Sequence, residues 1–172
     1  MDERRIDAEA LLEVIGLLSS PLDETPILRA VAGLAARAAR CEHAMVYLWD
    51  EEAALLVARG ATAGFHPLEG ELELALGEGL VGWAAMHRQP VLVPERATRD
   101  PRFRFVEAID EDRFQSILVS PLIGRDDVLV GVVIVRTQAP REFTAEDLDG
   151  VQAICALVAG ALQNQAEHGR TA

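Results

Sequence analysis

Two strand-length segments in the second half of the chain, residues 116–123 (SILVSPLI) and 128–135 (VLVGVVIV), are almost continuously apolar. The four residues between them, GRDD at 124–127, favour a turn, so we expect a β-hairpin here. A strand with one wet face would alternate apolar and polar residues, whereas these two strands do not. The hairpin must therefore lie at the centre of a sheet that is covered on both faces.

The rest of the chain supplies candidates for neighbouring strands and for the two covers. Helical spacing of apolar residues predicts long helices, and strand-like runs bounded by turn residues predict four further strands. Thr144 is the expected N-cap of the last helix, with Glu146 and Asp147 in its first turn. The order of elements predicts one α+β domain with an antiparallel sheet and the terminal helices on one face. The expected helices cover residues 7–19, 26–38, part of 77–89 and 144–165, and the strands cover 44–50, 54–61, 71–76 and 90–94.

Charge and composition exclude several classes of function. The formal net charge is −12, and all sixteen basic residues are arginine, so neither nucleic acid nor an anionic membrane surface is an expected partner. The absence of lysine removes Schiff-base chemistry and the P-loop. Cys41 and Cys155 form no metal-binding or disulfide motif. The first residues lack the apolar core of a signal peptide, and no segment is long enough to span a membrane, so we expect a cytoplasmic protein.

Four segments resemble, in this order, the GAF domain family: GEGLVGWAAMHRQPVLVPE from residue 77, DPRF from 100, RFQSILVSPLIGRDDVLVGVVIV from 113 and REFTAEDLDGVQAICALVAGAL from 141. The resemblance implies a six-stranded antiparallel sheet with the N- and C-terminal helices on one face. It implies a pocket on the other face, under a loop and a helix. The chain would be a single domain, with a dimerisation helix at residues 1–20, a GAF core at 21–165 and a tail at 166–172.

The resemblance also implies a function. GAF domains of bacterial signalling proteins and transcription regulators are sensory or regulatory, bind a small ligand or none, commonly form homodimers and act on an output domain or partner signalling protein. The enzymatic branch of the family, the free methionine sulfoxide reductases, uses pocket cysteines that this chain lacks, so no catalysis is expected. Phe143 and Asp147 keep part of the cyclic-nucleotide pattern, but Leu148 replaces the acid that follows. The ligand and any cofactor therefore remain unknown.

The candidate ligand site combines one helix with the long irregular segment 95–114. Trp83 and His87 lie four residues apart and so share a helix face. Arginines beside aromatic rings can hold an anion by paired hydrogen bonds and stacking, and in the segment they alternate with phenylalanines. The alternative is that these arginines pair with acids at 107 and 110–112 while the phenylalanines fix the loop. The candidates in the segment are Arg102, Phe103, Phe105 and Arg113.

Ser116 and Ser120 complete the candidate ligand site. They share one face of their strand with Leu118 and Leu122, because side chains alternate with a period of two. Two interpretations stay open: the hydroxyls point into the pocket, or they satisfy nearby backbone groups. Arg136, at the end of the next strand, has two possible positions, the rim of the pocket or a solvated strand end, and the solvated strand end is the favoured one.

Other motifs have plainer structural interpretations. Gly77, Gly79 and Gly82 outline the G-x-G-x-x-G of a dinucleotide site, but no βαβ unit surrounds them. A tight turn and a close contact between helix and sheet are expected instead. The alternating acids Glu69, Glu71 and Glu73 are expected on the wet face of a strand.

Two alternatives to a ligand-binding module follow from the sequence. The first is a ligand-free dimerisation or interaction module whose pocket is filled by side chains, an interpretation that apolar Leu118 and Leu122 and the aromatic loop favour. The second is a haem-based gas or redox sensor that uses His87 or His66. For the ligand-binding module itself, the first helix and the small-residue stripe of the last are expected to form a parallel helical dimer. The residues expected in this interface are Leu11, Ile15, Leu18, Ala153, Ala156 and Gly160.

Overall fold

The computed structural model describes residue 16 and residues 24–169. The central hairpin forms as predicted, with β5 (Ser116–Ile123) paired antiparallel to β6 (Leu129–Thr137). β6 also pairs with β1 (His43–Asp50), and β5 pairs with β4 (Val91–Val93). β2 (Leu55–Ala61) and β3 (Glu73–Leu74) complete a six-stranded sheet in the order β3-β2-β1-β6-β5-β4. The predicted α+β architecture with an antiparallel sheet is confirmed.

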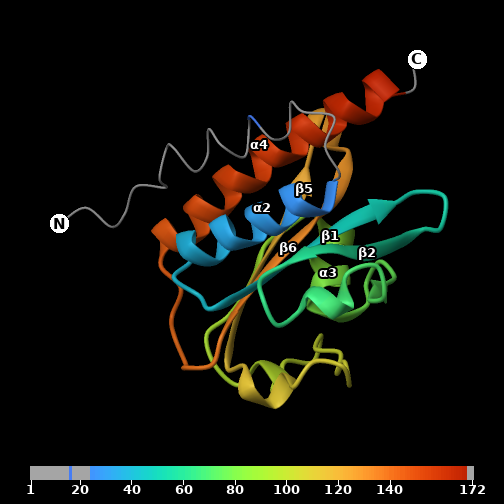
Figure 1. Ribbon diagram of the computed structural model, residues 1–172. Coiled ribbons are helices and arrows are strands. Elements are labelled where there is room, and N and C mark those ends of the chain that lie inside the picture. Colours follow the sequence, from blue (N-terminus) through green and yellow to red (C-terminus); the bar gives the residue numbers. More distant parts are fainter. Residues whose placement is uncertain (1–15, 17–23, 170–172) are drawn as a thin grey trace.

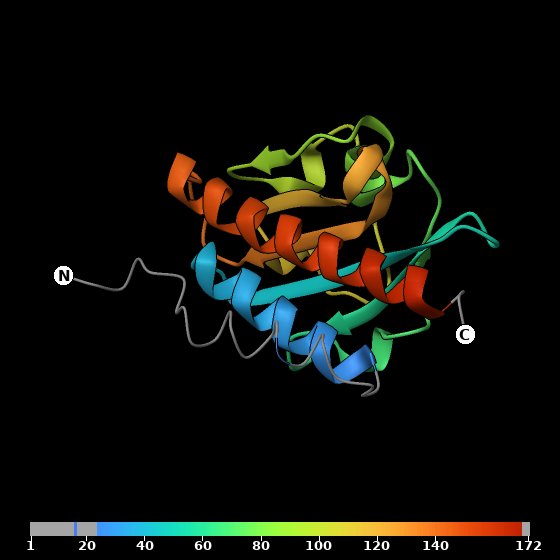
Figure 2. The same cartoon turned by 90° about the horizontal axis from the view of Figure 1, so that it is seen from above.

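Two long helices cover one face of this sheet. α2 (Glu24–Ala38) and α4 (Ala145–Gly169) lie side by side across the strands, as Figures 1 and 2 show. The apolar faces of both helices meet the sheet in one buried cluster that includes Leu28 of α2, Ile154 of α4 and Val133 of β6. We call this cover, formed by α2 and α4, the helix layer.

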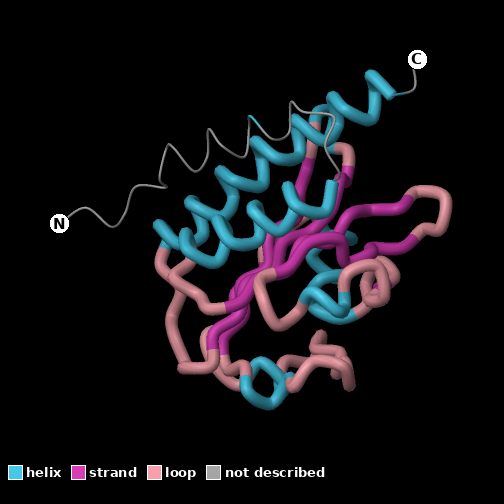
Figure 3. The backbone as a smooth tube through the Cα atoms, viewed as in Figure 1, coloured by secondary structure: helices cyan, strands magenta, loops and turns pink. Residues whose placement is uncertain are grey.

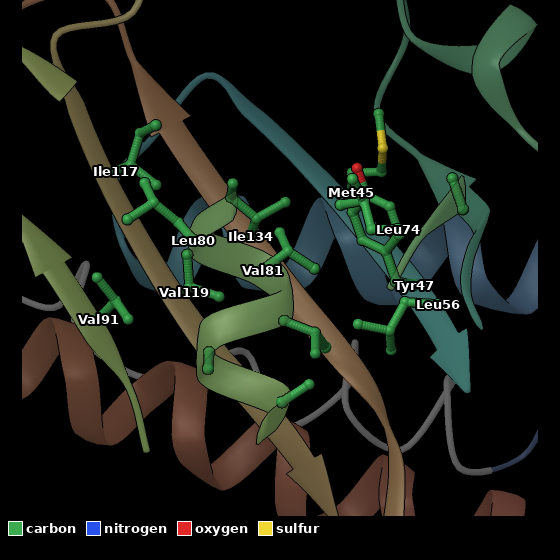
Figure 4. Packing of buried hydrophobic residues seen from close by; sticks show 14 of the residues in the cluster. Met45, Tyr47, Leu56, Leu74, Leu80, Val81, Val91, Ile117, Val119 and Ile134 are labelled. Carbon is green, nitrogen blue, oxygen red and sulfur yellow. The ribbon is translucent and has the colours of Figure 1, made fainter. Parts of the chain in front are cut away.

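A short helix and an irregular segment cover the opposite face. α3 (Gly79–His87) lies against the sheet, and residues 94–115, with two short 3₁₀ turns, continue the cover toward the far end, as Figure 3 shows. Figure 4 shows Leu80 and Val81 of α3 packed toward Val119 and Ile134 of the hairpin. Alternate residues of β5 and β6 thus face the two covers, which explains their continuous apolar pattern.

Two expected boundaries and the expected position of one side chain are wrong. β3 has only two residues instead of the six expected at 71–76, because residues 68–72 turn back on the carbonyls of Phe65 and Leu68. Glu69, expected on a wet strand face, lies in this turn, where its carboxylate accepts hydrogen bonds from Arg29 and the Ala61 N–H. α4 continues to Gly169, so the first residues of the predicted tail are helical.

The predicted N-terminal dimerisation helix, with Leu11, Ile15 and Leu18, lies outside the described residues apart from Gly16, as do residues 170–172.

The start of α4 is fixed by a reciprocal cap. Thr144 Oγ1 accepts a hydrogen bond from the Asp147 N–H at 3.1 Å, and Asp147 Oδ2 accepts one from the Thr144 N–H at 2.8 Å. The predicted N-cap is therefore confirmed, with an aspartate completing a capping box. Asp147 is buried and also accepts hydrogen bonds from Arg141 (2.6 Å) and Arg40 (3.3 Å), so it ties the end of α2 to the start of α4.

We expect Asp147→Asn to lower the free energy of unfolding at pH 7 by about 1–3 kcal/mol. Burial raises the pKa of Asp147, but hydrogen bonds from the Thr144 N–H, Arg40 and Arg141 outweigh it and hold the pKa below its usual range. A depressed folded-state pKa stabilises the fold above the unfolded-state pKa of about 3.9, and this contribution is lost as pH falls through the folded value. Urea unfolding at pH 7 and below pH 4 should therefore show that acid lowers the free energy of unfolding less in the variant than in the wild type. Asp149→Asn, at an exposed position of α4, is the control; equal acid sensitivity of Asp147→Asn and wild type would contradict the assignment.

Candidate functional site

The glycine motif before α3 forms a tight turn, as expected. Gly77 and Gly79 have φ of 80° and 66°, and the Gly77 N–H donates to the Gly82 carbonyl at 2.8 Å. A Cβ on Gly82 would lie 2.4 Å from the Ala75 carbonyl oxygen. β3 and β4, the strands on either side of α3 in sequence, lie at opposite edges of an antiparallel sheet, which is not the βαβ setting of a dinucleotide site.

Gly82→Ala should lower the free energy of unfolding by about 2 kcal/mol or more, because backbone must move to admit the new Cβ. Gly33→Ala, in the interior of α2, is the matched control. Its Cβ would meet nothing within 4 Å, so helix propensity should raise stability by up to about 1 kcal/mol. Urea denaturation of both variants measures the change in the free energy of unfolding. An unchanged free energy of unfolding in Gly82→Ala would refute the close contact.

Three of the predicted ligand-site residues come together in a stack at the surface. The rings of Trp83 and His87 are stacked at a centroid distance of 4.2 Å, and Arg102 Cζ lies 4.8 Å from the Trp83 ring. Arg102 is already engaged, because its Nε and Nη2 donate to the two carboxylate oxygens of Asp100 at 2.9 and 2.8 Å. Its hydrogen bonds hold the pKa of Asp100 below its usual range, although burial opposes this. The interactions within the stack therefore suit a structural role, in which the three side chains hold one another in place.

The other predicted residues of the 95–114 segment lie in different surroundings. Phe103 is half-buried against the core under α3, and Phe105 is 57% exposed. Arg113 lies over the ring of Phe114 at 5.1 Å and pairs with Asp110 at 3.7 Å. Arg113 thus pairs with one of the acids that the sequence offered as the alternative, whereas Arg102 pairs with Asp100, which lies outside that set.

Ser116 and Ser120 lie on the other face of the sheet from Trp83. Their strand neighbours Leu118 and Leu122 pack in the helix layer, so the alternation of β5 points the two serines the same way. Ser116 Oγ donates to the Pro94 carbonyl and accepts from the Arg141 N–H at 2.8 Å. This geometry corrects their assignment to the ligand site: the Ser116 hydroxyl satisfies backbone groups.

A buried ionic pair, which sequence reasoning missed, lies on the α3 side of the sheet. Arg136 of β6 is 5% exposed, and Glu111 of the 94–115 segment is 2% exposed. Arg136 Nη1 lies 3.8 Å from Glu111 Oε2. The expectation of a solvated strand end is wrong, because Arg136 shares the inward register of Ile134 and sits beside His43 in the neighbouring strand.

Aromatic rings surround this pair. The ring of His43 meets Phe65 and Phe114 edge-on at 5.1 and 5.3 Å, and Arg136 Cζ lies 5.9 and 5.8 Å from the same two phenylalanines. We call Arg136, Glu111, His43, Phe65 and Phe114 the Arg136 cluster.

The Arg136 cluster contains unused hydrogen-bonding atoms. His43 Nδ1, Glu111 Oε2 and both Nε and Nη1 of Arg136 are buried with no hydrogen-bond partner among the described residues. At 3.8 Å the ion pair is too long for a hydrogen bond. Because buried charges without hydrogen bonds are costly, such groups in a native protein call for an explanation beyond packing.

Burial also shifts the titration of the cluster. It raises the pKa of Glu111, with Arg136 opposing and Asp112 adding to the rise. It lowers the pKa of His43, and Arg113 and Arg136 lower it further against the pull of Glu42. The His43 ring is therefore neutral near pH 7, with one N–H donor and one acceptor.

The remaining reactive side chains are engaged elsewhere. Cys155 is buried in the helix layer and Cys41 follows the end of α2, and burial raises the pKa of each thiol to about 12. His66 Nε2 lies 3.0 Å from the Ala61 carbonyl, and His87 Nδ1 lies 3.0 Å from that of Trp83. Within residues 24–169 no group of three or more His, Cys, Asp or Glu side chains could hold a metal ion. None of the described helices is long and apolar enough to cross a membrane.

Comparison with known proteins decides the family. The family model described as GAF domain matches residues 23–162. The chain belongs to the GAF domain family. The family is generally sensory or regulatory. A comparison with curated protein sequences found no match.

Solved structures of other proteins share the fold at low sequence identity. The GAF domain of a phosphoenolpyruvate-protein phosphotransferase from Acinetobacter is 20% identical with a TM-score of 0.78, covering 96% of this chain and 98% of that one. A methyl-accepting chemotaxis protein is 19% identical with a TM-score of 0.71, covering 88% and 95%. The free methionine-R-sulfoxide reductase of Neisseria meningitidis is 19% identical with a TM-score of 0.69, covering 92% and 90%.

Proposed function

We propose that this chain is a cytoplasmic, non-catalytic sensory GAF domain that binds a small ligand at the Arg136 cluster and relays its presence to an output domain or partner protein. The setting would be bacterial signal transduction or transcription regulation. The observation that carries the proposal is the pair of buried charges with unused hydrogen-bonding atoms under the 94–115 segment. A ligand with complementary polar groups would satisfy those atoms.

The state of the cysteines supports a non-catalytic role, although some similar structures are reductases. The thiolate is the nucleophilic form of cysteine, and a pKa of about 12 leaves it negligible at neutral pH. Cys155 also faces the helix layer, across the sheet from the Arg136 cluster. We expect no turnover of methionine sulfoxide by this chain.

Native mass spectrometry of protein purified gently from its own host tests the ligand proposal. We expect a retained small mass that is released on denaturation. An absorption spectrum of the same sample tests the haem alternative, which predicts a Soret band. Two results together would contradict ligand binding: the purified protein retains no small mass, and no fraction of a host metabolite extract raises its unfolding temperature.

The exposed face of α4 favours a second role, homodimerisation. Ala153 and Ala156 are exposed, Leu157 is 44% exposed, and a Cβ on Gly160 would meet nothing within 4 Å. Small side chains beside an exposed leucine permit another helix to approach closely. The predicted parallel dimer through this face remains part of the proposal.

Sedimentation at tens of micromolar should show a dimer, and Ala156→Arg should convert it to monomer because the charge would be buried against the partner copy. Val128→Arg is the control, since Val128 is also exposed (44%) but lies outside α4. A wild-type monomer, or equal effects of the two variants, would argue against this interface.

A further inference from the structure

Arg136 is the one arginine among the described residues that is buried. Its neighbours in the sheet, His43 and Ile117, hold its backbone in register on both sides. Neither Nε nor Nη1 has an acceptor within residues 24–169. A guanidinium offers adjacent N–H donors along two edges, a geometry that matches the two oxygens of a carboxylate. Nε and Nη1 lie on different edges, and each shares its edge with Nη2, so a carboxylate on either edge would satisfy one of the two unused donors.

Glu111 already presents a carboxylate to Arg136, but imperfectly. Its Oε2 is buried without a hydrogen bond at 3.8 Å from Nη1. Arg136 belongs to the rigid sheet, whereas Glu111 opens a 3₁₀ turn (Glu111–Arg113) in the irregular segment. Another carboxylate with better geometry would gain the hydrogen bonds that Glu111 leaves unmade.

The walls of the site indicate what the carboxylate is attached to. Phe65 and Phe114 lie against both Arg136 and His43, and fully buried Tyr47 belongs to the same core cluster as the two phenylalanines. These rings favour an apolar or aromatic body. The cluster holds one buried guanidinium and one buried carboxylate, so a monoanion that replaces the Glu111 carboxylate keeps the charge beside Arg136 unchanged, whereas a dianion such as phosphate would add a further negative charge.

We propose that Arg136 binds a small monocarboxylate with an apolar or aromatic body, and that this ligand displaces Glu111 from Arg136. The neutral His43 ring supplies a second hydrogen-bond donor to the ligand. Ile109 and Phe114, both 1% exposed, anchor the segment on either side of Glu111, so displacement of Glu111 changes the cover of the sheet. This inference rests on the proposed function and names its ligand class.

Isothermal titration calorimetry of the full chain tests the ligand class with acetate, butyrate, hexanoate and phenylacetate. Phenylacetamide serves as the neutral match and inorganic phosphate as the competing oxyanion. We expect affinity to rise with the apolar body, and phenylacetate to bind about tenfold or more tightly than phenylacetamide because only the carboxylate is charged. Absence of binding by all four carboxylates, or binding of phosphate alone, would overturn the inference.

Two pairs of variants test the roles of Arg136 and Glu111. Arg136→Lys keeps the charge but loses the paired donors, and should weaken phenylacetate binding about tenfold or more. Its control, Arg37→Lys, makes the same change at an exposed position of α2, on the other face of the sheet, and should bind within about threefold of wild type. Glu111→Gln should tighten binding about tenfold because the internal competitor loses its charge. Its control, Asp112→Asn, removes the same charge from the next, exposed residue and should have little effect.

Weaker binding by Glu111→Gln would show that Glu111 helps to hold the ligand, and would overturn displacement. If Arg136→Lys fails to fold, the Glu111→Gln pair still decides this point. Failure of the inference is distinguishable from failure of the proposed function. A retained mass that is not a monocarboxylate ends the inference alone, whereas no retained mass and no binding of any probe or extract fraction ends both.

Discussion

Burial of the β5–β6 hairpin on both faces is the constraint on which the rest of the structure depends. The central strands hydrogen-bond to β1 and β4 on their outer edges, so their polar backbone is satisfied within the sheet. The backbone of β1 leaves no room for a side chain at one position of β6, where a Cβ on Gly131 would lie 2.1 Å from the Tyr47 carbonyl oxygen. Both apolar faces then need a cover, and the order of elements along the chain decides which segment covers which face.

The two covers differ in rigidity. The helix layer consists of two long helices that Asp147 joins to each other at one end through its bonds to Arg40 and Arg141. The other cover consists of the short α3 and an irregular segment held by a few buried side chains, such as Ile109 and Phe114. Segments with fewer regular hydrogen bonds open more readily than long packed helices. Binding that reshapes a cover is therefore expected on the α3 side, where the Arg136 cluster lies.

The periodicity of apolar residues and the residue types typical of turns and helix caps predicted most of the fold from the sequence. The continuous apolar runs indicated a hairpin with two covers, and Thr144 marked the start of α4, because both features are local in the chain. β3 was overestimated because charged and apolar residues also alternate through the turn at 68–72, where backbone bonds to preceding carbonyls replace strand pairing. The alternation of charged and apolar residues is compatible with both a turn and a strand, so it could not predict which of the two forms.

The candidate site was harder to predict because it depends on tertiary register. The period of two correctly placed Ser116 and Ser120 with Leu118 and Leu122, but it does not tell which cover that face meets. Arg136 follows Ile134 in the inward register of β6, a signal that could have indicated burial. Glu111 carried no such signal, since it lies in a run of acids of which it alone is buried.

The ionic pair is difficult to explain as a stabilising contact. Buried ion pairs can often be replaced by well-packed apolar residues without loss of stability, and this pair lacks even the hydrogen bonds that offset desolvation. Its location suits a coupling role better, because Val135, the residue before Arg136, packs in the helix layer with α2 and α4. β6 thus contributes alternate side chains to the proposed ligand site and to the core beneath the proposed dimer helix. A ligand that displaces Glu111 from Arg136 would therefore act beside the strand that the proposed ligand site and the proposed dimer surface share.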